Sequence, residues 1–342
     1  LAPLAFALLL TTTAARAGEP ITLAQAMADP DWIGPPVEAM WWRWDGKAAQ
    51  YTLKRAGGSI RDTWQVDVGG GTPVMLDGSA RADLDEAGAV IDGGGTRSAF
   101  VRNGDVFVRD LRTGALLPLT RGGERAGRLQ WGSDGALAWR AGAAWYRWDG
   151  RLVVQAALPK AEDAPDTPPP ADDLRDRQLR LIATLKDDRA RRDAARVQAD
   201  DWRKADPTRA PAPVYLGKGV EIADAALSPD GRWLLAVTRE KGADGGRAGK
   251  MPVYVTESGY EEFEDVRTRV GRGDPLPHRL WLADLATGKL AELAFDPLPG
   301  IAVDPLAAMR KAAGKPALQG NRALQVGDVQ WSADGRNAAV ML

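Results

Sequence analysis

Leu227-Ser228-Pro229-Asp230-Gly231-Arg232-Trp233-Leu234-Leu235-Ala236-Val237 is the stretch that decides the fold, because its pattern occurs three times. Trp131-Gly132-Ser133-Asp134-Gly135 repeats it in the middle of the chain, and Trp331-Ser332-Ala333-Asp334-Gly335 repeats it close to residue 342. In each copy an apolar anchor precedes a short turn with Asp-Gly, and an alternating apolar run follows. Asp-Gly tolerates the positive φ angles of tight turns, and the alternation buries one face of a strand. Each copy therefore predicts a β-hairpin.

A second phrase alternates with these hairpins: an apolar strand, then Asp, then a turn that contains Gly. It occupies residues 64–71, 106–114 and 280–288. Two kinds of hairpin in alternation form a four-stranded unit, which is the blade of a β-propeller. The three Asp-Gly turns of the first phrase are 96 and 104 residues apart, about twice the roughly 40–50 residues of one blade. The spacing therefore predicts insertions in an all-β propeller.

The pattern predicts a first blade that begins near residue 40, a second over residues 89–120 and a third over residues 129–154. The insertions that we expect occupy residues 160–210, 240–275 and 295–325. The last of them is expected to contain a short helix at residues 305–312. Long insertions in a regular repeat usually lie on a functional face, because loops vary without disturbing the core.

The first insertion contains a charged run without Pro or Gly, residues 172–205, which predicts one long helix or a helical hairpin. One apolar stripe can collect Leu174, Leu181, Leu185, Ala195 and Trp202. One interpretation is a surface helix with internal ion pairs that docks through this stripe. The other is an arm that guards an entrance or contacts a second subunit.

The composition excludes a strong overall electrostatic field. The chain has 45 basic and 46 acidic side chains and a formal net charge of −1, so nothing in its total charge draws it to nucleic acid. It has 13 Trp against 5 Phe and 5 Tyr, and several of the Trp stand at the anchors of the repeat. We interpret them as blade core and as wedges between blades.

Residues 1–17 are typical of the later part of a secretory signal peptide. An apolar run from Leu1 to Leu10 is too short to span a bilayer, and Ala15-Arg16-Ala17 precedes the expected cleavage site. The alternative is a buried N-terminal strand or helix. We expect an exported protein, periplasmic or secreted, that has no membrane contact after cleavage. The absence of Cys is compatible with export. Because the sequence has no initiating Met and stops within an apolar run, we expect it to be part of a longer protein.

Motifs for catalysis are missing from the sequence. It contains no Gly-x-Ser-x-Gly elbow, no phosphate-binding Gly-x-x-x-x-Gly-Lys-Ser/Thr loop, no His-Glu-x-x-His and no calcium loop. Its one histidine, His278, stands between Pro277 and Arg279 without a nearby Ser in an exposed turn, so we expect a structural or solvent-facing role. The Gly triplets 69–71 and 93–95 are expected in hairpin turns and not in a phosphate cradle.

With repeats and insertions assigned, the chain resembles the N-terminal propeller of the prolyl oligopeptidase family of serine peptidases, in particular its exported bacterial dipeptidyl-peptidase-like branch. The three hairpin motifs and the phrase at residues 280–288 carry the resemblance, although TolB-like and other propellers share them. The order of three features along the chain is more specific. An exported N-terminus comes first, and Asp29-Pro30-Asp31-Trp32-Ile33-Gly34 follows it. A segment that begins with Lys250-Met251-Pro252-Val253-Tyr254 and ends at Arg269 then lies between two blades. The resemblance covers the chain after residue 17.

The resemblance implies a seven- or eight-bladed propeller that caps a C-terminal α/β-hydrolase domain with the catalytic Ser, Asp and His. This chain is then expected to hold four blades and the start of a fifth, without that domain and without a catalytic residue. Cleavage of short peptides belongs to the complete protein. The implied partners are a peptide substrate and the hydrolase domain, with no cofactor and no metal, and homo-oligomer formation stays open.

The resemblance also implies one binding site inside the chain. Dipeptidyl-peptidase propellers hold the free amino terminus of the substrate with a pair of glutamates in a Tyr-Glu-Glu-like context, which here matches Tyr260-Glu261-Glu262. Paired carboxylates suit an ammonium group in a partly desolvated cavity. This sequence differs from the family pattern after the pair. In the family a Trp-Ser-Pro-Asp-Gly hairpin follows the two glutamates directly, whereas here Phe263-Glu264 and then Asp265-Val266-Arg267-Thr268-Arg269 follow them.

Two alternatives stand beside this hypothesis. Glu261 and Glu262 can belong to an acidic insertion whose carboxylates pair with Arg267, Arg269 or Arg272. The whole chain can also be a non-catalytic, TolB-like periplasmic propeller that acts as an interaction scaffold, since one fold hosts both roles. The long charged helix and the uneven spacing favour the peptidase.

Overall fold

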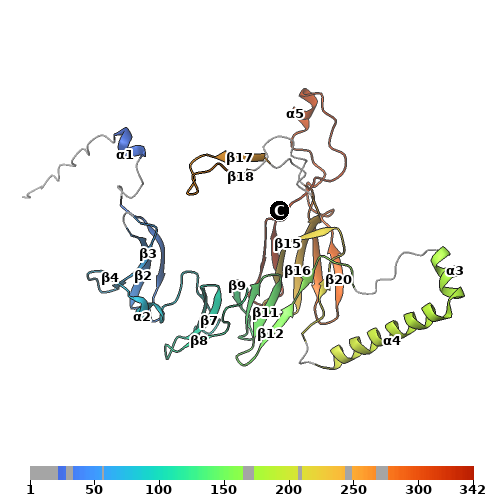
Figure 1. Ribbon diagram of the computed structural model, residues 1–342, viewed down its shortest axis with the longest axis horizontal. Helices are drawn as coiled ribbons and strands as arrows, with labels where there is room; N and C mark the ends of the chain where they lie inside the picture. Colours follow the sequence, from blue (N-terminus) through green and yellow to red (C-terminus); the bar gives the residue numbers. More distant parts are fainter. Residues whose placement is uncertain are drawn as a thin grey trace, which may run out of the picture. The chain divides into compact units, whose positions relative to one another are not determined.

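The computed structural model describes residues 22–27, 34–55, 58–164, 173–206, 210–242, 249–266 and 276–342. The chain divides into two compact units, residues 1–87 and 88–342 (Figure 1). The expected signal peptide, and the arginines expected to pair with Glu261 and Glu262, lie outside the described residues.

The first unit contains one complete blade. After the short helix α1 (Leu23–Met27), four antiparallel strands follow one another in chain order: β1 (Val37–Trp42), β2 (Ala48–Lys54), β3 (Arg61–Asp67) and β4 (Val74–Met75). The short helix α2 (Gly78–Arg81) comes next, with Asp77 as its N-cap. Gln50 lies at the centre of the sheet, where it accepts a hydrogen bond from Trp41 Nε1 at 2.8 Å and donates to Gln65 Oε1 at 3.0 Å. This satisfied polar network connects three of the four strands.

The second unit contains three more four-stranded antiparallel sheets. In each sheet the strands lie side by side in chain order, and in the last sheet the inserted hairpin over residues 249–266 (β17–β18) is skipped. The first is β5 (Val90–Ile91), β6 (Arg97–Arg102), β7 (Asp105–Asp110) and β8 (Leu116–Pro118); the next is β9 (Ala126–Trp131), β10 (Leu137–Ala141), β11 (Ala144–Trp148) and β12 (Val153–Ala157); the last is β15 (Val220–Leu227), β16 (Trp233–Glu240), β19 (Arg279–Asp284) and β20 (Lys289–Leu293). A hairpin of β21 (Asp328–Trp331) and β22 (Ala338–Met341) follows. The prediction of four blades and the start of a fifth, in a partial β-propeller, is confirmed.

The insertions fold as separate elements. Between the third and fourth blades, β13 (Pro159–Lys160) pairs in parallel with β14 (Val214–Tyr215) at the base of a helical segment. That segment consists of α3 (Asp173–Leu181) and α4 (Ala183–Ala205), because Ile182 adopts an extended conformation with φ −112° and ψ 92°. A hairpin of β17 (Gly249–Val253) and β18 (Glu262–Val266) lies between β16 and β19, and α5 (Ala307–Ala312) confirms the helix expected in the last insertion.

The described side chains of the predicted apolar stripe are exposed, and the side chain of Leu181 lies outside the described part. Leu185 and Trp202 are 44% and 56% exposed, so these side chains are not buried against a blade. Arg–Asp pairs along α4, such as Arg189 with Asp193, support the helix internally instead.

Aspartates organise the turns of the blades. Asp230 accepts hydrogen bonds from the backbone N–H of Arg232 and from the hydroxyl of Ser228, and Gly231 takes a φ of +74°. Asp284 accepts from the backbone N–H groups of Ala286 and Thr287 in the other kind of turn. Short carboxylate side chains that bond to the following backbone are what stabilise such turns.

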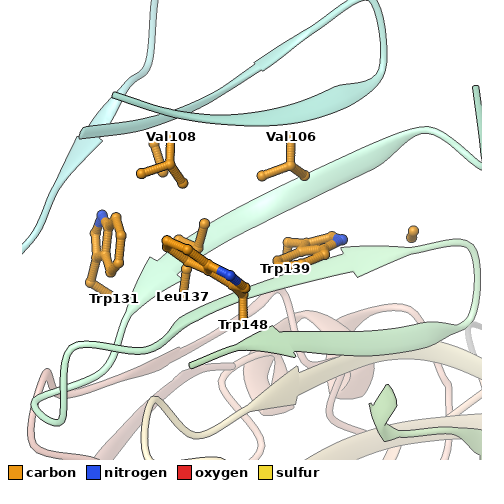
Figure 2. Close-up of a cluster of buried hydrophobic side chains, with 8 residues drawn as sticks. Val106, Val108, Trp131, Leu137, Trp139 and Trp148 are labelled. Atoms are coloured by element: carbon orange, nitrogen blue, oxygen red, sulfur yellow. The ribbon is translucent and has the colours of Figure 1, made fainter. Parts of the chain in front are cut away.

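The core lies between successive blades of the second unit. Figure 2 shows Val106 and Val108 of β7 directed toward Trp131, Leu137 and Trp139 of the next blade. Successive residues of a strand point to opposite faces. Trp139 therefore packs toward the second blade while its neighbour Ala138 packs toward Leu227 and Leu234 of the fourth. A third cluster joins the fourth blade to Val329 of the last hairpin. Trp131, Trp139, Trp145 and Trp148 are buried in or between blades, as predicted, whereas Trp42 and Trp202 are exposed.

Candidate functional site

The predicted carboxylate pair lies on the inserted hairpin β17–β18. In this hairpin Val253 is paired with Glu262, and Pro252 with Phe263. Glu262 is the first residue of β18, and Glu261 immediately precedes the strand. Both side chains are exposed.

Hydrogen bonds of the hairpin loop position Glu262. The Ser258 hydroxyl donates to Glu262 Oε1 at 2.7 Å, and the Thr256 hydroxyl donates to the Tyr260 carbonyl at 2.6 Å. Gly259, with a φ of +72°, supplies the left-handed position that the turn requires. The loop therefore holds the start of β18 in a defined conformation.

The period of the strand brings together a pair of carboxylates that the sequence analysis missed. Glu262 and Glu264 are two residues apart in β18, so they share one face, together with Val253 and Met251 of β17. Phe263 lies on the opposite face with Pro252. The two-residue spacing of Glu262 and Glu264 within a strand is the signal that predicts this arrangement.

Large apolar side chains of the same hairpin and its loop are exposed. Tyr254, Val255, Tyr260 and Phe263 are 74%, 93%, 80% and 59% exposed. Several large apolar side chains exposed within one hairpin are typical of a surface that contacts a ligand or another protein.

His278 has a structural role in the fourth blade. Its backbone N–H donates to the Leu324 carbonyl at 2.8 Å, and its Nδ1 accepts a hydrogen bond from the Val326 N–H at 3.0 Å. Burial and the nearby Arg239 cation lower the pKa of His278 below 6.5. The neutral ring with its proton on Nε2 therefore fastens the end of the last insertion to the start of β19.

Two cavities lie elsewhere in the second unit. One, of about 360 Å³, is lined by His278, by β20 and by the last insertion. The other, of about 830 Å³, lies between the C-terminal part of α4, residues 210–215 and the turn between β19 and β20.

Among the residues that the structure describes, no three or more His, Cys, Asp or Glu side chains are grouped so that they could hold a metal ion. No helix in the described ranges is both long and apolar enough to cross a membrane.

Comparison with known proteins finds similarity in structure alone. No model of a protein family matches the sequence, and no curated protein matches it. Among solved structures, the chain is similar to dipeptidyl peptidase 4 from Porphyromonas gingivalis, with a TM-score of 0.33, 12% identity and coverage of 78% of this chain and 34% of that one. A protein assigned as TolB from Agrobacterium tumefaciens has a TM-score of 0.27, 12% identity and coverage of 75% and 64%.

The β-propeller domain of the Trilobed protease from Pyrococcus furiosus has a TM-score of 0.28, 10% identity and coverage of 78% of this chain and 73% of that domain. The chain thus spans about a third of the peptidase and less than two thirds of the TolB protein. The blade architecture follows from the sheets of the chain itself.

Proposed function

We propose that this chain is the propeller part of an exported serine peptidase of the prolyl oligopeptidase family. In this proposal the catalytic Ser, Asp and His belong to an α/β-hydrolase domain that follows the propeller, and the complete protein cleaves short peptides. The propeller limits the size of the substrate and orients it.

The observation that carries the proposal is the acidic hairpin β17–β18, inserted between the second and third strands of the fourth blade. Glu261 and Glu262 would hold the ammonium group of a peptide, and the Ser258 hydroxyl positions one of the two carboxylates. A carboxylate positioned by a hydrogen bond binds an ammonium group more strongly than a freely rotating one.

The first test is the coding sequence beyond the codon for Leu342. The proposal expects further blades and then a Gly-x-Ser-x-Gly elbow, followed by Asp and then His. A reading frame that completes a propeller without these residues would favour the scaffold described below.

The second test uses the complete protein and chromogenic dipeptide substrates with a free or an acetylated amino terminus. E261Q and E262Q are expected to lower kcat/KM about 10- to 100-fold for free amino termini only, since each removes a charge-assisted hydrogen bond. E257Q changes a carboxylate of the same loop and is the matched control. Equal losses for free and acetylated substrates would contradict the assigned role.

The export step has its own test. Purification from the secreted and periplasmic fractions, followed by mass spectrometry of the N-terminus, is expected to give a chain that begins at Gly18. A mature chain that retains residues 1–17 would contradict export through cleavage at Ala17.

The second candidate function is a TolB-like, non-catalytic scaffold. The observation that favours it is the exposed apolar side chains of the hairpin and of α4, such as Tyr254, Val255 and Trp202. These surfaces suit a protein partner.

A further inference from the structure

A separate cavity of about 360 Å³ lies where the last insertion folds back onto the fourth blade. The start of β19, the end of β20 and both ends of the insertion form its walls. Small-molecule sites occupy roughly 300–1,000 Å³, so this cavity has room for a small ligand.

Backbone hydrogen bonds hold the walls of the cavity in place. The Arg322 N–H donates to the Ile301 carbonyl at 3.0 Å, and Ile301 is 7% exposed. His278 binds the returning segment twice, through its N–H to Leu324 and through its Nδ1 to Val326. These bonds position the two ends of the insertion that line the cavity, and a preformed site requires such positioned walls.

The lining carries both signs of charge together with apolar side chains. Arg279 and Arg322 supply guanidinium groups, and Glu292 and Asp296 supply carboxylates. Leu293, Phe295 and Ile301 supply the apolar surface.

The guanidinium groups make only long contacts with the described residues. Arg279 Nε lies 3.8 Å from Glu292 Oε1, beyond hydrogen-bond range. Arg322 reaches the Ile301 and Gly300 carbonyls at 3.4 and 3.3 Å. Asp296 is positioned by Asn321, whose Nδ2 donates to one carboxylate oxygen at 2.6 Å. Both arginines therefore have N–H groups that can donate hydrogen bonds to a ligand, and one carboxylate oxygen of Asp296 can accept one.

We propose that this cavity binds a small zwitterion, namely a free α-amino acid with an apolar side chain. Arg279 and Arg322 bind its carboxylate, and Asp296 and Glu292 bind its ammonium group. Phe295 and Ile301 contact its side chain. The proposal rests on the cavity alone and holds whether or not the complete protein is a peptidase.

The deciding experiment is calorimetric titration of the complete protein with three ligands of equal side chain. L-leucine carries both charges, leucinamide lacks the carboxylate, and N-acetyl-L-leucine lacks the ammonium group. We expect L-leucine to bind with a Kd below about 1 mM and each analogue to bind at least about tenfold more weakly. Equal affinities, or no binding of L-leucine at concentrations well above that Kd, would overturn the proposal.

Two variants then locate the site. R279Q and D296N are each expected to weaken L-leucine binding about tenfold, because each removes one charged partner. R191Q changes an arginine on α4 whose side chain is 80% exposed, and it should bind as the wild type does. Thermal melts establish that the variants are folded. If folded R279Q and D296N bind like the wild type, the cavity is not the site; if they unfold, the analogue series on the wild type decides.

Discussion

The indole Nε1 of Trp131 donates a hydrogen bond to the backbone carbonyl of Val90 at 3.0 Å. Trp131 ends β9 and Val90 begins β5, so the bond joins the third blade to the second. Trp331, at the same position of the last repeat, donates to the Ala226 carbonyl of the preceding blade at 3.1 Å. The repeated tryptophan therefore links each of these blades to the one before it.

The repeat at Leu227, in the fourth blade, has a different interblade hydrogen bond. Leu227 has no side-chain donor at the position of Trp131, and here Gln130 Nε2 donates to the Leu227 carbonyl at 2.7 Å. The third and fourth blades are thus also joined by a side-chain hydrogen bond, but here the donor belongs to the earlier blade.

Trp131→Phe should destabilise the second unit by about 1–3 kcal/mol, because it removes a buried hydrogen bond and reshapes the core. It also weakens the contact with Arg97, whose guanidinium carbon lies 4.6 Å from the Trp131 ring centroid. Urea denaturation measures the change. Trp202→Phe on the exposed face of α4 is the control, and equal midpoints for the two variants would contradict the interblade role.

Gly132→Ala should destabilise the junction of the third and fourth blades by about 1–3 kcal/mol. A Cβ at this position would lie 2.5 Å from the Pro229 carbonyl oxygen and 2.6 Å from Asp134 Oδ1, so backbone of the next blade would have to move. Gly123→Ala meets no atom within 4 Å and should be close to neutral. Thermal unfolding compares the two, and an unchanged Tm for Gly132→Ala would refute the close approach of the blades.

The Asp92 carboxylate should make stability fall in acid. Burial alone would raise its pKa, but hydrogen bonds from the backbone N–H groups of Arg97 and Thr96 outweigh burial and lower the pKa to about 2. Because the unfolded chain binds this proton first, the stabilisation is complete above pH 4 and is lost toward pH 2.

Asp92→Asn should therefore cost about 2 kcal/mol at pH 7 and reduce the loss of stability between pH 4 and pH 2. Urea denaturation at several pH values tests this, with Asp187→Asn on α4 as the control. The same acid dependence in wild type and Asp92→Asn would show that another group is responsible.

His278 should stay neutral to a lower pH in the folded chain than in the unfolded one, since burial and Arg239 lower its pKa. Its contribution to stability is complete above about pH 6.5 and is lost as the pH falls through the lower folded value, because the unfolded state protonates first. The chain has one histidine, so its ring resonances can be assigned without ambiguity in an NMR titration. A midpoint at or above 6.5 would contradict the buried acceptor role of Nδ1.

Much of the fold could be predicted from the sequence, because its signals are local. Asp-Gly pairs and strand alternation predicted the hairpin at Asp230, the turn at Asp284 and the start of the fifth blade. The helix at residues 307–312 and the helical insertion followed from local composition as well. In each case the turn or helix depends on neighbouring residues in the chain, so short stretches of sequence are sufficient.

The tertiary structure decided what depends on contacts between distant residues. It determines that Trp139 packs toward the second blade and Ala138 toward the fourth, and that Trp131 reaches Val90. It also leaves Leu185 and Trp202 of the helical insertion exposed. The face shared by Glu262 and Glu264 and the cavity beside His278 likewise arise from pairing register and from a returning insertion. The sequence by itself determined the kind of hairpin and the order of the blades, because turn chemistry acts within a few residues; only folding determined which side chains from separate blades meet.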